Sequence, residues 1–387
     1  MRRIRVAHLI TNLALGGAQD YMLLVIRGLD RSKYHPIVAG RLDGEWAELV
    51  RSWNDVEWYD IPSLQREISP LNDIKAILEI RRFCREKNID ILHTHSSKAG
   101  VVGRLGGRLA SVPATIHTVH GFSFHNFMPA LQRSLYINVE RAMSLFTTAL
   151  ILYSDGDRQT ALELGIGAQK SVETFYYGID YSPFQHECDR EAIRRDFGFN
   201  PSDVVIGFTG RISEQKALHI LIDAFVRINA SFPNTRLMIV GDGPLREQLE
   251  SQAKRNGIEE RVLITGFRSD IPMVLRAMDV FVMTSFWEGL SRSLAEAMYA
   301  NLPIIATDVG GTSDAVRNGV TGWLIPPNDV NAVVQALTEV IGDPERARTI
   351  AEHSHKWALH AFDVDTMHKR ISKLYDHLME EHWEKSP

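Results

Sequence analysis

The chain has 387 residues, of which 44% are hydrophobic and 24% are charged, and its formal net charge is −5. This length allows two domains with full cores, and a mildly negative chain without a lysine or arginine run is not typical of a nucleic-acid-binding protein. The only cysteines, Cys84 and Cys188, are too few for a disulfide framework or a cysteine-ligated metal site, which favours a reducing compartment.

The N-terminus combines basic residues with an apolar run, which is the layout of a signal peptide. Arg5, His8, Thr11 and Asn12 interrupt that run, and a first buried strand at Ile4–Ile10 explains it better. No segment approaches the roughly 20 apolar residues that span a bilayer. The sequence therefore predicts a soluble, cytoplasmic protein.

In the first half of the chain, short apolar runs alternate with segments of helical periodicity. Strands are predicted at Ile4–Ile10, His35–Ala39, Ile89–His93, Ala114–Val119 and Ala149–Tyr153. Helices are predicted at 18–29, 72–87, 98–110 and 129–145. This alternation is typical of a parallel sheet with a helix between successive strands.

The same rhythm starts again after Gly178. Strands are predicted at Val204–Gly207, Arg236–Val240, Val262–Ile264, Val280–Met283, Ile304–Ala306 and Trp323–Ile325. The sequence thus predicts an α/β protein with two doubly wound domains, residues 1–178 and 179–362, that face each other across a cleft. Residues 363–387 are predicted to form a polar amphipathic helix that could pack back on the first domain. Ligands of such folds bind outside the carboxyl ends of the strands.

The segment Thr284–Pro303 carries the strongest indication of a site. It follows an apolar strand, Asp279–Met283, and has helical periodicity over Ser291–Tyr299. Gly289 lets the backbone of the intervening turn come close to a ligand. Free backbone N–H groups at the start of the helix favour a bound phosphate. They belong to Leu290, Ser291 and Arg292.

Two glutamates, Glu288 and Glu296, lie in this segment. At about 100° and 1.5 Å per residue, they differ by roughly 80° around a helix and about 12 Å along it. One carboxylate could bind the hydroxyls of a sugar and the other a ribose, with a diphosphate at the helix end between them. This suits a nucleoside diphosphate sugar. From the spacing alone, two solvated glutamates on an amphipathic surface helix remain an equal alternative.

Two features of the first half follow predicted strands. Gly16 and Gly17 lie between the first strand and the first helix, where the backbone could lie against a phosphate or a sugar ring. An ordinary tight turn is the simpler explanation of a Gly-Gly pair alone. His120 directly follows the strand Ala114–Val119, and an imidazole there can hydrogen-bond a sugar hydroxyl or move a proton near neutral pH.

Other histidines are concentrated near the same strand ends. They are His93, His95, His117 and His125. The spacing of His93 and His95 would suit two metal ligands on one strand face, but no nearby cysteine or acidic residue completes a set, and no metal is predicted. A hydrogen-bonded structural histidine is the better interpretation of His93 and His117.

A second potential metal motif is the D-x-D pattern Asp155-Gly156-Asp157, which binds a divalent metal in other sugar transferases. Ser154 and Asp155 directly precede a helical pattern, however, so a helix N-cap is the better explanation.

In the second half, Gly210 begins the turn after the first strand. Arg211 and Lys216 flank this turn and could neutralise a leaving diphosphate, with ordinary surface charges as the open alternative. Phe267 follows a later strand at the same rim, where backbone groups could pair with a nucleobase. A simple strand-to-helix turn is the alternative there.

Taken together, these segments resemble the retaining glycosyltransferases of family 4, which have the GT-B fold. The resemblance covers nearly the whole chain and is strongest over Gly207–Asp329. The matching segments are Gly16-Gly17, HTHSSKAGVVGRLGG from His93, HTVHGFSF from His117, GRISEQK from Gly210, VGDGPL from Val240, EGLSRSLAEAM from Glu288, ATDVGG from Ala306 and NGVTGWLIPPND from Asn318. Their order and spacing together are highly specific.

The resemblance implies an acceptor-binding first domain and a nucleotide-sugar-binding second domain, and it implies roles for single residues. Glu288 would contact the donor sugar, Glu296 the ribose, and Arg211 with Lys216 the diphosphate. His120 would lie by the reacting sugar, with the Gly16-Gly17 loop closing over it.

Three positions depart from the usual pattern of the family. Ser291 stands where many relatives have proline, Ala217 where glycine often follows the lysine, and Asp314 where glutamate is usual. None of these departures removes a charge from the implied machinery.

The sequence and the resemblance together predict a metal-independent hexosyltransferase without a cofactor. It would move a sugar from a nucleoside diphosphate, expected to be UDP, to a hydroxyl of a glycan or lipid-linked acceptor, with retention. Arg211, Lys216 and the helix N-terminus at Leu290 would stabilise the departing diphosphate. Two alternatives stay open: a UDP-N-acetylglucosamine 2-epimerase of the same fold, and a non-catalytic scaffold subunit.

The segments around His95 and His120 resemble the branch of the family that builds bacterial surface polysaccharides on a lipid carrier. Phe122, Phe124 and Phe127 follow His120, and they could contact the cytoplasmic face of a membrane or hold a lipid-linked acceptor. The alternative is that these rings cap the core of the first domain.

Overall fold

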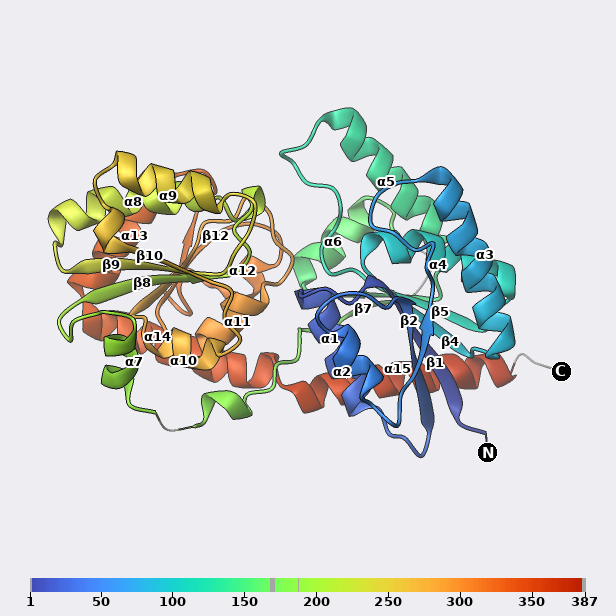
Figure 1. The fold of residues 1–387 in the computed structure, drawn as a ribbon. Coiled ribbons are helices and arrows are strands. Elements are labelled where there is room, and N and C mark those ends of the chain that lie inside the picture. The colour runs from blue at the N-terminus through green and yellow to red at the C-terminus, as the bar shows by residue number, and fades with distance from the viewer. Residues whose placement is uncertain (1, 168–170, 187, 385–387) are drawn as a thin grey trace. The chain divides into compact units, whose positions relative to one another are not determined.

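The structure is a computed structural model, which describes residues 2–167, 171–186 and 188–384. The chain forms two compact units (Figure 1). Unit 1 is Met1–Gly178 with Val364–Pro387, and unit 2 is Ile179–Asp363. In each unit parallel strands alternate along the chain with helices, which confirms the predicted α/β class with two Rossmann-like sheets.

Within its described residues, the sheet of unit 1 has seven strands in the order β3-β2-β1-β4-β5-β6-β7, and neighbouring strands are parallel. The strands are β1 (Ile4–Asn12), β2 (Tyr34–Arg41), β3 (Glu57–Asp60), β4 (Ile91–His95), β5 (Ala114–Thr118), β6 (Ala149–Leu152) and β7 (Ser171–Thr174). Five of them match predicted strands. The edge strands β3 and β7 do not, because each has four residues and neither forms an apolar run.

The predicted helices of unit 1 are present within a few residues of their expected bounds, and the short helix Ala47–Arg51 is one that the sequence does not predict. The helices are α1 (Gly17–Gly28), α2 (Ala47–Arg51), α3 (Pro70–Glu86), α4 (Ser97–Ala110), α5 (Ala130–Ser144), α6 (Asp155–Glu163) and α15 (Val364–Glu384). The Ser154 hydroxyl accepts a hydrogen bond from the Asp157 N–H, 2.9 Å away, so the predicted N-cap of α6 is confirmed, with the D-x-D residues inside the first turn.

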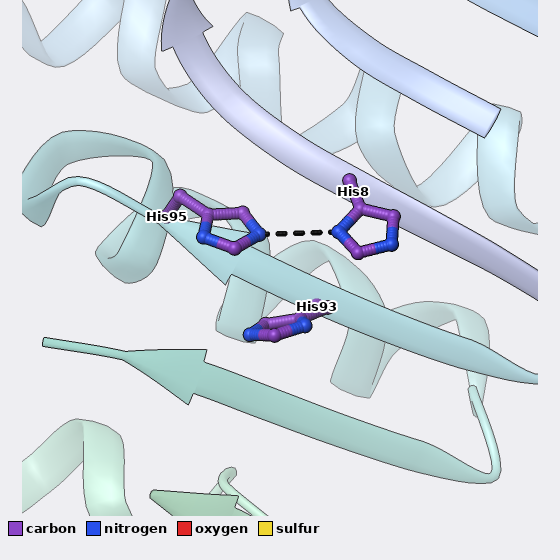
Figure 2. A group of neighbouring side chains, drawn as sticks. All are labelled: His8, His93 and His95. Atoms are coloured by element: carbon purple, nitrogen blue, oxygen red, sulfur yellow. Dashed lines mark hydrogen bonds between the residues drawn. The ribbon is translucent and has the colours of Figure 1, made fainter. Parts of the chain in front are cut away.

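Helix α15 lies near the C-terminal end of the chain but belongs to unit 1, where it runs along the sheet region (Figure 1). Its buried side chains repeat at helical spacing, as an amphipathic helix requires. They are Met367, Ile371, Leu374, Tyr375, Leu378 and Met379. The Tyr375 hydroxyl lies 2.6 Å from His93 Nδ1 in the core of unit 1. There His93, His95 and His8 gather on the adjacent strands β4 and β1 (Figure 2).

Within the described part of unit 2, six parallel strands have the order β10-β9-β8-β11-β12-β13. The strands are β8 (Val204–Thr209), β9 (Thr235–Val240), β10 (Val262–Gly266), β11 (Val280–Met283), β12 (Ile304–Thr307) and β13 (Trp323–Ile325). All six match predicted strands, because each contains a short apolar run. The order of connection reverses between β8 and β11, and ligands of doubly wound sheets bind at such a reversal.

Two kinds of helix lie between these strands. The α-helices are α7 (Arg190–Asp196), α8 (Leu218–Ser231), α9 (Arg246–Arg255), α10 (Ile271–Arg276), α11 (Arg292–Tyr299), α12 (Thr312–Ala315), α13 (Val330–Gly342) and α14 (Pro344–Ala361). Short 3-10 turns are η1 (Ser182–Phe184), η2 (Glu214–Lys216) and η3 (Glu259–Arg261).

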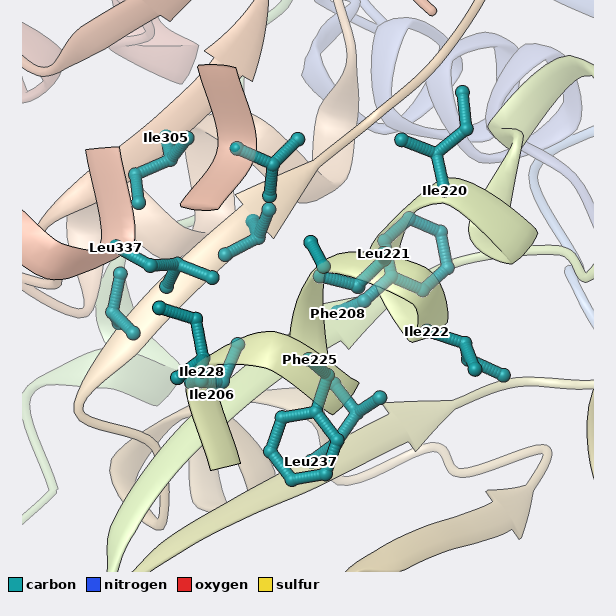
Figure 3. Packing of buried hydrophobic residues seen from close by; sticks show 14 of the residues in the cluster. Ile206, Phe208, Ile220, Leu221, Ile222, Phe225, Ile228, Leu237, Ile305 and Leu337 are labelled. Carbon is teal, nitrogen blue, oxygen red and sulfur yellow. The ribbon is translucent and has the colours of Figure 1, made fainter. Parts of the chain in front are cut away.

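The core of unit 2 lies where α8 and α13 pack on the sheet (Figure 3). Phe208 of β8, Phe225 of α8, Ile305 of β12 and Leu337 of α13 are all fully buried in one cluster. This core fixes the strands whose carboxyl ends carry the predicted site residues.

Candidate functional site

In unit 2, the Lys216 ammonium forms an ion pair with the carboxylate of Glu288. Both side chains are largely buried, with 13% and 7% of their surface exposed. The Ser285 hydroxyl donates to Glu288 Oε1 at 2.8 Å, and Gln215 Nε2 lies 3.4 Å from Oε2. The predicted cation and the predicted anion therefore meet directly, at the junction of η2 with the turn before α11.

Several backbone contacts hold this junction in place. The Phe286 N–H donates to the Gln215 carbonyl at 2.8 Å, and the Thr307 hydroxyl of β12 donates to the Ser285 carbonyl at 2.7 Å. Gly310, after β12, has φ +52°, and a Cβ there would lie 1.8 Å from the Glu288 carbonyl oxygen. Only glycine permits this close approach, so the loop after β12 is shaped to support the turn that carries Glu288.

Helix α11 begins one residue later than predicted, with Ser291 as its N-cap. The Ser291 side chain makes no capping hydrogen bond to the helix, and its hydroxyl lies 3.0 Å from that of Ser293. Because no side-chain cap covers the first turn, its backbone N–H groups can receive an anion. Gly289 lies in the turn before the helix, as predicted, and Leu290, whose N–H is predicted at the helix start, also lies in that turn.

One turn into α11, Glu296 is mostly buried and accepts a hydrogen bond at 2.7 Å from Nε of Arg292. The exposed fraction of its side chain is 10%, against 39% for Arg292. Glu296 is therefore not a fully solvated surface residue. It belongs to a different charged pair from Glu288.

Three further predicted residues lie at the ends of β8 and β10. Gly210 has φ +145°, a backbone conformation that side chains disfavour. Arg211 is exposed, and no ion pair joins it to another residue of the described ranges, so its charge can meet a ligand anion. Phe267 is 61% exposed, directly after β10.

In unit 1, the two predicted glycines lie at the start of α1. Gly16 has an extended backbone with φ 171°, and a Cβ on Gly17 would meet no atom within 4 Å. Neither glycine therefore adopts the left-handed backbone that other residues disfavour. What the glycines provide is an uncovered helix start, held by the Tyr177 hydroxyl, which donates to the Gly17 carbonyl at 3.1 Å.

His120 follows β5 and has both ring nitrogens engaged. Nδ1 lies 3.1 Å from the Tyr153 hydroxyl, and Nε2 lies 3.3 Å from His95 Nδ1. The Tyr21 ring packs edge-on against the imidazole, with 5.4 Å between ring centroids. Burial lowers the pKa of His120 to about 3, so the ring is neutral at pH 7. A neutral imidazole offers one donor and one acceptor.

A small pocket of unit 1 opens beside His120. Its lining includes the start of α4, the segment after β5 and a carboxylate of α5. The lining side chains with polar groups are Ser96, Ser97, His117, Thr118, Ser123 and Glu140. Glu140 is paired at 2.9 Å with the fully buried guanidinium of Arg104, which fixes its carboxylate in the wall of the pocket.

Three other histidines of unit 1 form a buried group that could in principle ligate a metal. One ring nitrogen from each of His8, His93 and His95 lies within 4.8 Å of the others. However, His93 already has a partner at 2.6 Å on each nitrogen, Tyr375 and Thr118. The structure therefore supports the prediction that His93 is a satisfied structural histidine, and the metal-ligand pair that the spacing of His93 and His95 would suit lacks a free ligand atom on His93.

The buried histidines of unit 1 predict acid sensitivity. Burial lowers the pKa of His8 and His120 to about 3, and it also lowers the pKa of His93, His95 and His117. Below the ordinary histidine pKa of about 6.5, the unfolded chain therefore binds more protons than the folded protein. The free energy of unfolding falls as the pH falls from about 6.5 towards 3.

We expect the free energy of unfolding to fall by about 1.4 kcal/mol per pH unit for each such histidine below pH 6. Urea unfolding at pH 7.5 and pH 5.5 measures this. A His8→Gln variant should show a shallower pH dependence than the wild-type protein. Equal stability at the two pH values would contradict the neutral state of these rings.

Family models match both halves of the chain. The model for glycosyl transferases group 1 matches residues 189–357, and that for a glycosyl transferase 4-like domain matches residues 16–178. The chain belongs to the glycosyltransferase 4-like family. Its two parallel sheets are the Rossmann-like pair of the GT-B fold. The chain is thus a glycosyltransferase, which is the class of enzyme that its motifs indicate.

Relatives of known name match this glycosyltransferase along most of its length. The UDP-Gal:alpha-D-GlcNAc-diphosphoundecaprenol alpha-1,3-galactosyltransferase of Escherichia coli is 28% identical over 379 residues, which cover 97% of this chain and 96% of that protein. The putative glycosyltransferase EpsD of Bacillus subtilis is 27% identical over 328 residues, covering 84% and 86%.

A crystal structure of Anabaena HepE in complex with UDP and glucose matches the glycosyltransferase with a TM-score of 0.81 and 25% identity, over 97% of this chain and 100% of that chain. The sucrose-phosphate synthase of Thermosynechococcus elongatus shares the fold, with a TM-score of 0.85 at 20% identity.

The aromatic residues after His120 differ from the membrane-contact prediction. Phe124 is 7% exposed, and Phe122 stacks on it with 4.7 Å between ring centroids, so both belong to a core cluster of unit 1. Phe127 alone of the three is well exposed, at 52%. The alternative, that these rings cap the core, is correct for Phe122 and Phe124. Among the described helices of this glycosyltransferase, none has the length and apolarity that crossing a bilayer requires.

Sequence reasoning missed several residues that support the predicted ones. Ser285 and Gln215 hold the Glu288 carboxylate, and Tyr153 holds His120 together with His95, which the sequence indicates only as a potential metal ligand. Their only sequence signal is a position directly beside a predicted site residue or at the end of a predicted strand.

Proposed function

We propose that this enzyme moves a hexose from a UDP-sugar to a hydroxyl of a lipid-linked acceptor during the synthesis of a bacterial surface polysaccharide. The observation that carries the proposal is the ion pair between Lys216 and Glu288, beside the uncapped start of α11. The similarity to a UDP-galactose-dependent enzyme acting on a diphosphoundecaprenol substrate, and to a protein crystallised with UDP, supports the choice of donor and acceptor class.

In unit 2, the donor would lie over the carboxyl ends of β8 and β11. The exposed guanidinium of Arg211, the ammonium of Lys216 and the N–H groups at the start of α11 would bind the diphosphate. Glu288 would accept hydrogen bonds from sugar hydroxyls once Lys216 turns towards the phosphate. These cationic groups lower the energy of the departing diphosphate, so an acceptor hydroxyl can attack the same face of an oxocarbenium-like centre with retention.

The other end of the donor would use two residues further from the diphosphate. Glu296 would give up its hydrogen bond from Arg292 and accept hydrogen bonds from the ribose hydroxyls instead. The backbone beside Phe267 would pair with the nucleobase. Glu296 lies on α11, the helix that follows β11, and Phe267 directly follows β10. Both residues therefore come after the carboxyl ends of strands in the sheet of unit 2.

Unit 1 would supply the acceptor side of the reaction. His120 and the uncovered helix start at Gly16 and Gly17 would contact sugar hydroxyls, and the pocket lined by Glu140 and Ser123 offers hydrogen-bonding groups to a glycan. A neutral His120 would form such a contact by sharing or exchanging one of its two present partners.

The test is a transfer assay with a set of UDP-hexoses and an N-acetylglucosaminyl diphospholipid. Formation of a disaccharide lipid together with UDP supports the proposal. Conversion of UDP-N-acetylglucosamine to its 2-epimer without transfer would support an epimerase instead, and no reaction of any donor would support a scaffold role.

Replacing Glu296 with alanine is expected to weaken UDP binding by about 10-fold or more, because a hydrogen bond to a charged group contributes about 1.5–3 kcal/mol. Isothermal titration with UDP measures this. Arg292→Ala is the matched control, since it removes the partner of Glu296 on the same helix and leaves the carboxylate for the ribose. Equal UDP affinity of Glu296→Ala and wild type would contradict the ribose contact.

A peripheral contact with a membrane would use the exposed side chains at the start of α5. Leu131 and Leu135 lie one helical turn apart and are 86% and 60% exposed, next to Phe127. The double variant Leu131→Gln/Leu135→Gln should lower binding to anionic phospholipid vesicles by about 10-fold or more, since burying each leucine contributes about 1.5–3 kcal/mol.

Co-sedimentation with vesicles measures this contact. Val320→Gln is the control, because Val320 is an exposed apolar residue of unit 2, at 50%. If the α5 variant and the Val320 variant sediment alike, α5 is not the contact.

A further inference from the structure

Four side chains of unit 1 form a continuous chain of hydrogen-bonding contacts. Tyr153 Oη lies 3.1 Å from His120 Nδ1, His120 Nε2 lies 3.3 Å from His95 Nδ1, and His95 Nε2 lies 3.2 Å from His8 Nδ1. Figure 2 shows the last of these contacts, with the rings of His95 and His8 facing each other from neighbouring strands. The chain thus joins His120 to a residue deep in the sheet.

Each imidazole in this chain constrains the next. A neutral imidazole carries its proton on one nitrogen and accepts a hydrogen bond on the other. Two arrangements satisfy every contact. In the first, all three rings are protonated on Nδ1, so that His8 donates to His95, His95 to His120, and His120 to Tyr153. In the second, all three are protonated on Nε2, and every hydrogen bond runs the opposite way.

The buried end of the chain distinguishes the two arrangements. His8 is fully buried, and its Nε2 has no hydrogen-bond partner among the residues that the structure describes. The second arrangement would leave an N–H group there without an acceptor, whereas the first leaves only a lone pair. Buried N–H groups without partners are rarer in proteins than under-satisfied acceptors. The first arrangement is therefore favoured.

We propose that His8 and His95 are positioning residues, which hold His120 as the Nδ1–H tautomer and fix the orientation of its ring. The inference rests on the proposed function, because His120 is the residue through which they would act. In this tautomer the lone pair of His120 is occupied by the N–H of His95. His120 then serves a substrate as a hydrogen-bond donor through Nδ1, not as a general base.

Two substitutions of His95 separate positioning from packing. In His95→Asn the side-chain amide occupies the place of the His95 Nδ1 and can still donate to His120. In His95→Gln the amide reaches the place of the His95 Nε2 and contacts only His8. For UDP release from UDP-galactose, with water as acceptor, His95→Gln should lower kcat by about 10-fold or more and His95→Asn by less than about 3-fold. The KM for the donor should change in neither variant. Equal losses of kcat in the two variants would contradict the proposal.

The direct test is nitrogen NMR of the whole ¹⁵N-labelled protein, with the His120 signals assigned by comparison with His120→Gln. We expect His120 of the wild type to be protonated on Nδ1 and to lose this preference in His95→Gln. A wild-type His120 protonated on Nε2, or one that exchanges between tautomers, would overturn the proposal. Because this readout needs no turnover, an enzyme inactive with UDP-galactose and with the other UDP-hexoses would count against the proposed function and leave the tautomer of His120 measurable.

Discussion

Replacing Lys216 with alanine is expected to lower the turnover of sugar transfer by about 10²-fold or more, by analogy with the loss of one preorganised donor to a developing negative charge. The Lys216 side chain is only 13% exposed, so the interaction of its ammonium with a phosphate is weakly screened by water. Its backbone is also held in place, because the Thr284 hydroxyl donates to the Lys216 carbonyl at 3.1 Å. Initial rates at saturating UDP-sugar measure the effect.

The matched control is Lys254→Ala. Lys254 is an exposed lysine on α9 of the same unit, and its removal should leave turnover unchanged. A Lys216→Ala enzyme with nearly normal turnover would contradict the role of Lys216 at the diphosphate. Thermal melting shows whether the variant still folds. We expect it to fold, because the carboxylate of Glu288 keeps the hydroxyl of Ser285 as a hydrogen-bond partner.

Replacing Glu288 with alanine is the second large effect that we expect, a loss of turnover of about 10²-fold or more. The change removes the carboxylate that the sugar hydroxyls would bind, and it leaves a largely buried ammonium without its counter-ion. The same kinetic assay measures it. Glu288→Gln keeps the size of the side chain and one acceptor, so we expect it to lie between alanine and the wild type.

A double variant tests whether Lys216 and Glu288 act as a unit. Groups that act together show losses that do not add. The turnover of the double alanine variant should therefore be little lower than that of the less active single variant. Fully multiplicative losses would show that the two residues act independently, and a Glu288→Ala enzyme as active as the wild type would contradict the role of Glu288 at the sugar.

The strands of unit 2 could be predicted almost completely from the sequence. Strands such as Val280–Met283 are buried on both faces and therefore form apolar runs that stand out from their surroundings. Edge strand β3, by contrast, alternates half-buried and exposed residues, and its four residues give no such run. The sequence signal therefore depends on the apolar run and not on the place in the sheet, because the edge strands β10 and β13 contain such runs and match predicted strands.

For the candidate site, the sequence predicts which residues carry charge but not which of them meet. Lys216 and Glu288 are 72 positions apart, and His8 and His95 are 87 positions apart, so their contacts come from the order of strands in each sheet. No local spacing encodes such pairings. The same holds for Gly310, whose requirement for glycine comes from the Glu288 carbonyl that it approaches.

The backbone at Ala217 explains why relatives usually have glycine at this position. Ala217 has φ +47° and ψ +39°, the left-handed conformation that glycine adopts without a Cβ penalty. The usual glycine of relatives fits this geometry, and alanine adopts it here directly after Lys216. The sequence shows the departure and the backbone angles show why glycine is usual, but nothing in the structure explains the alanine.

The most direct test of the donor site is a crystal structure of the protein with UDP. We expect the diphosphate at the start of α11, with oxygens within hydrogen-bonding distance of Lys216 and Arg211 and with the ribose beside Glu296. A diphosphate bound elsewhere on the protein, with the pair of Lys216 and Glu288 left intact and untouched, would contradict the account.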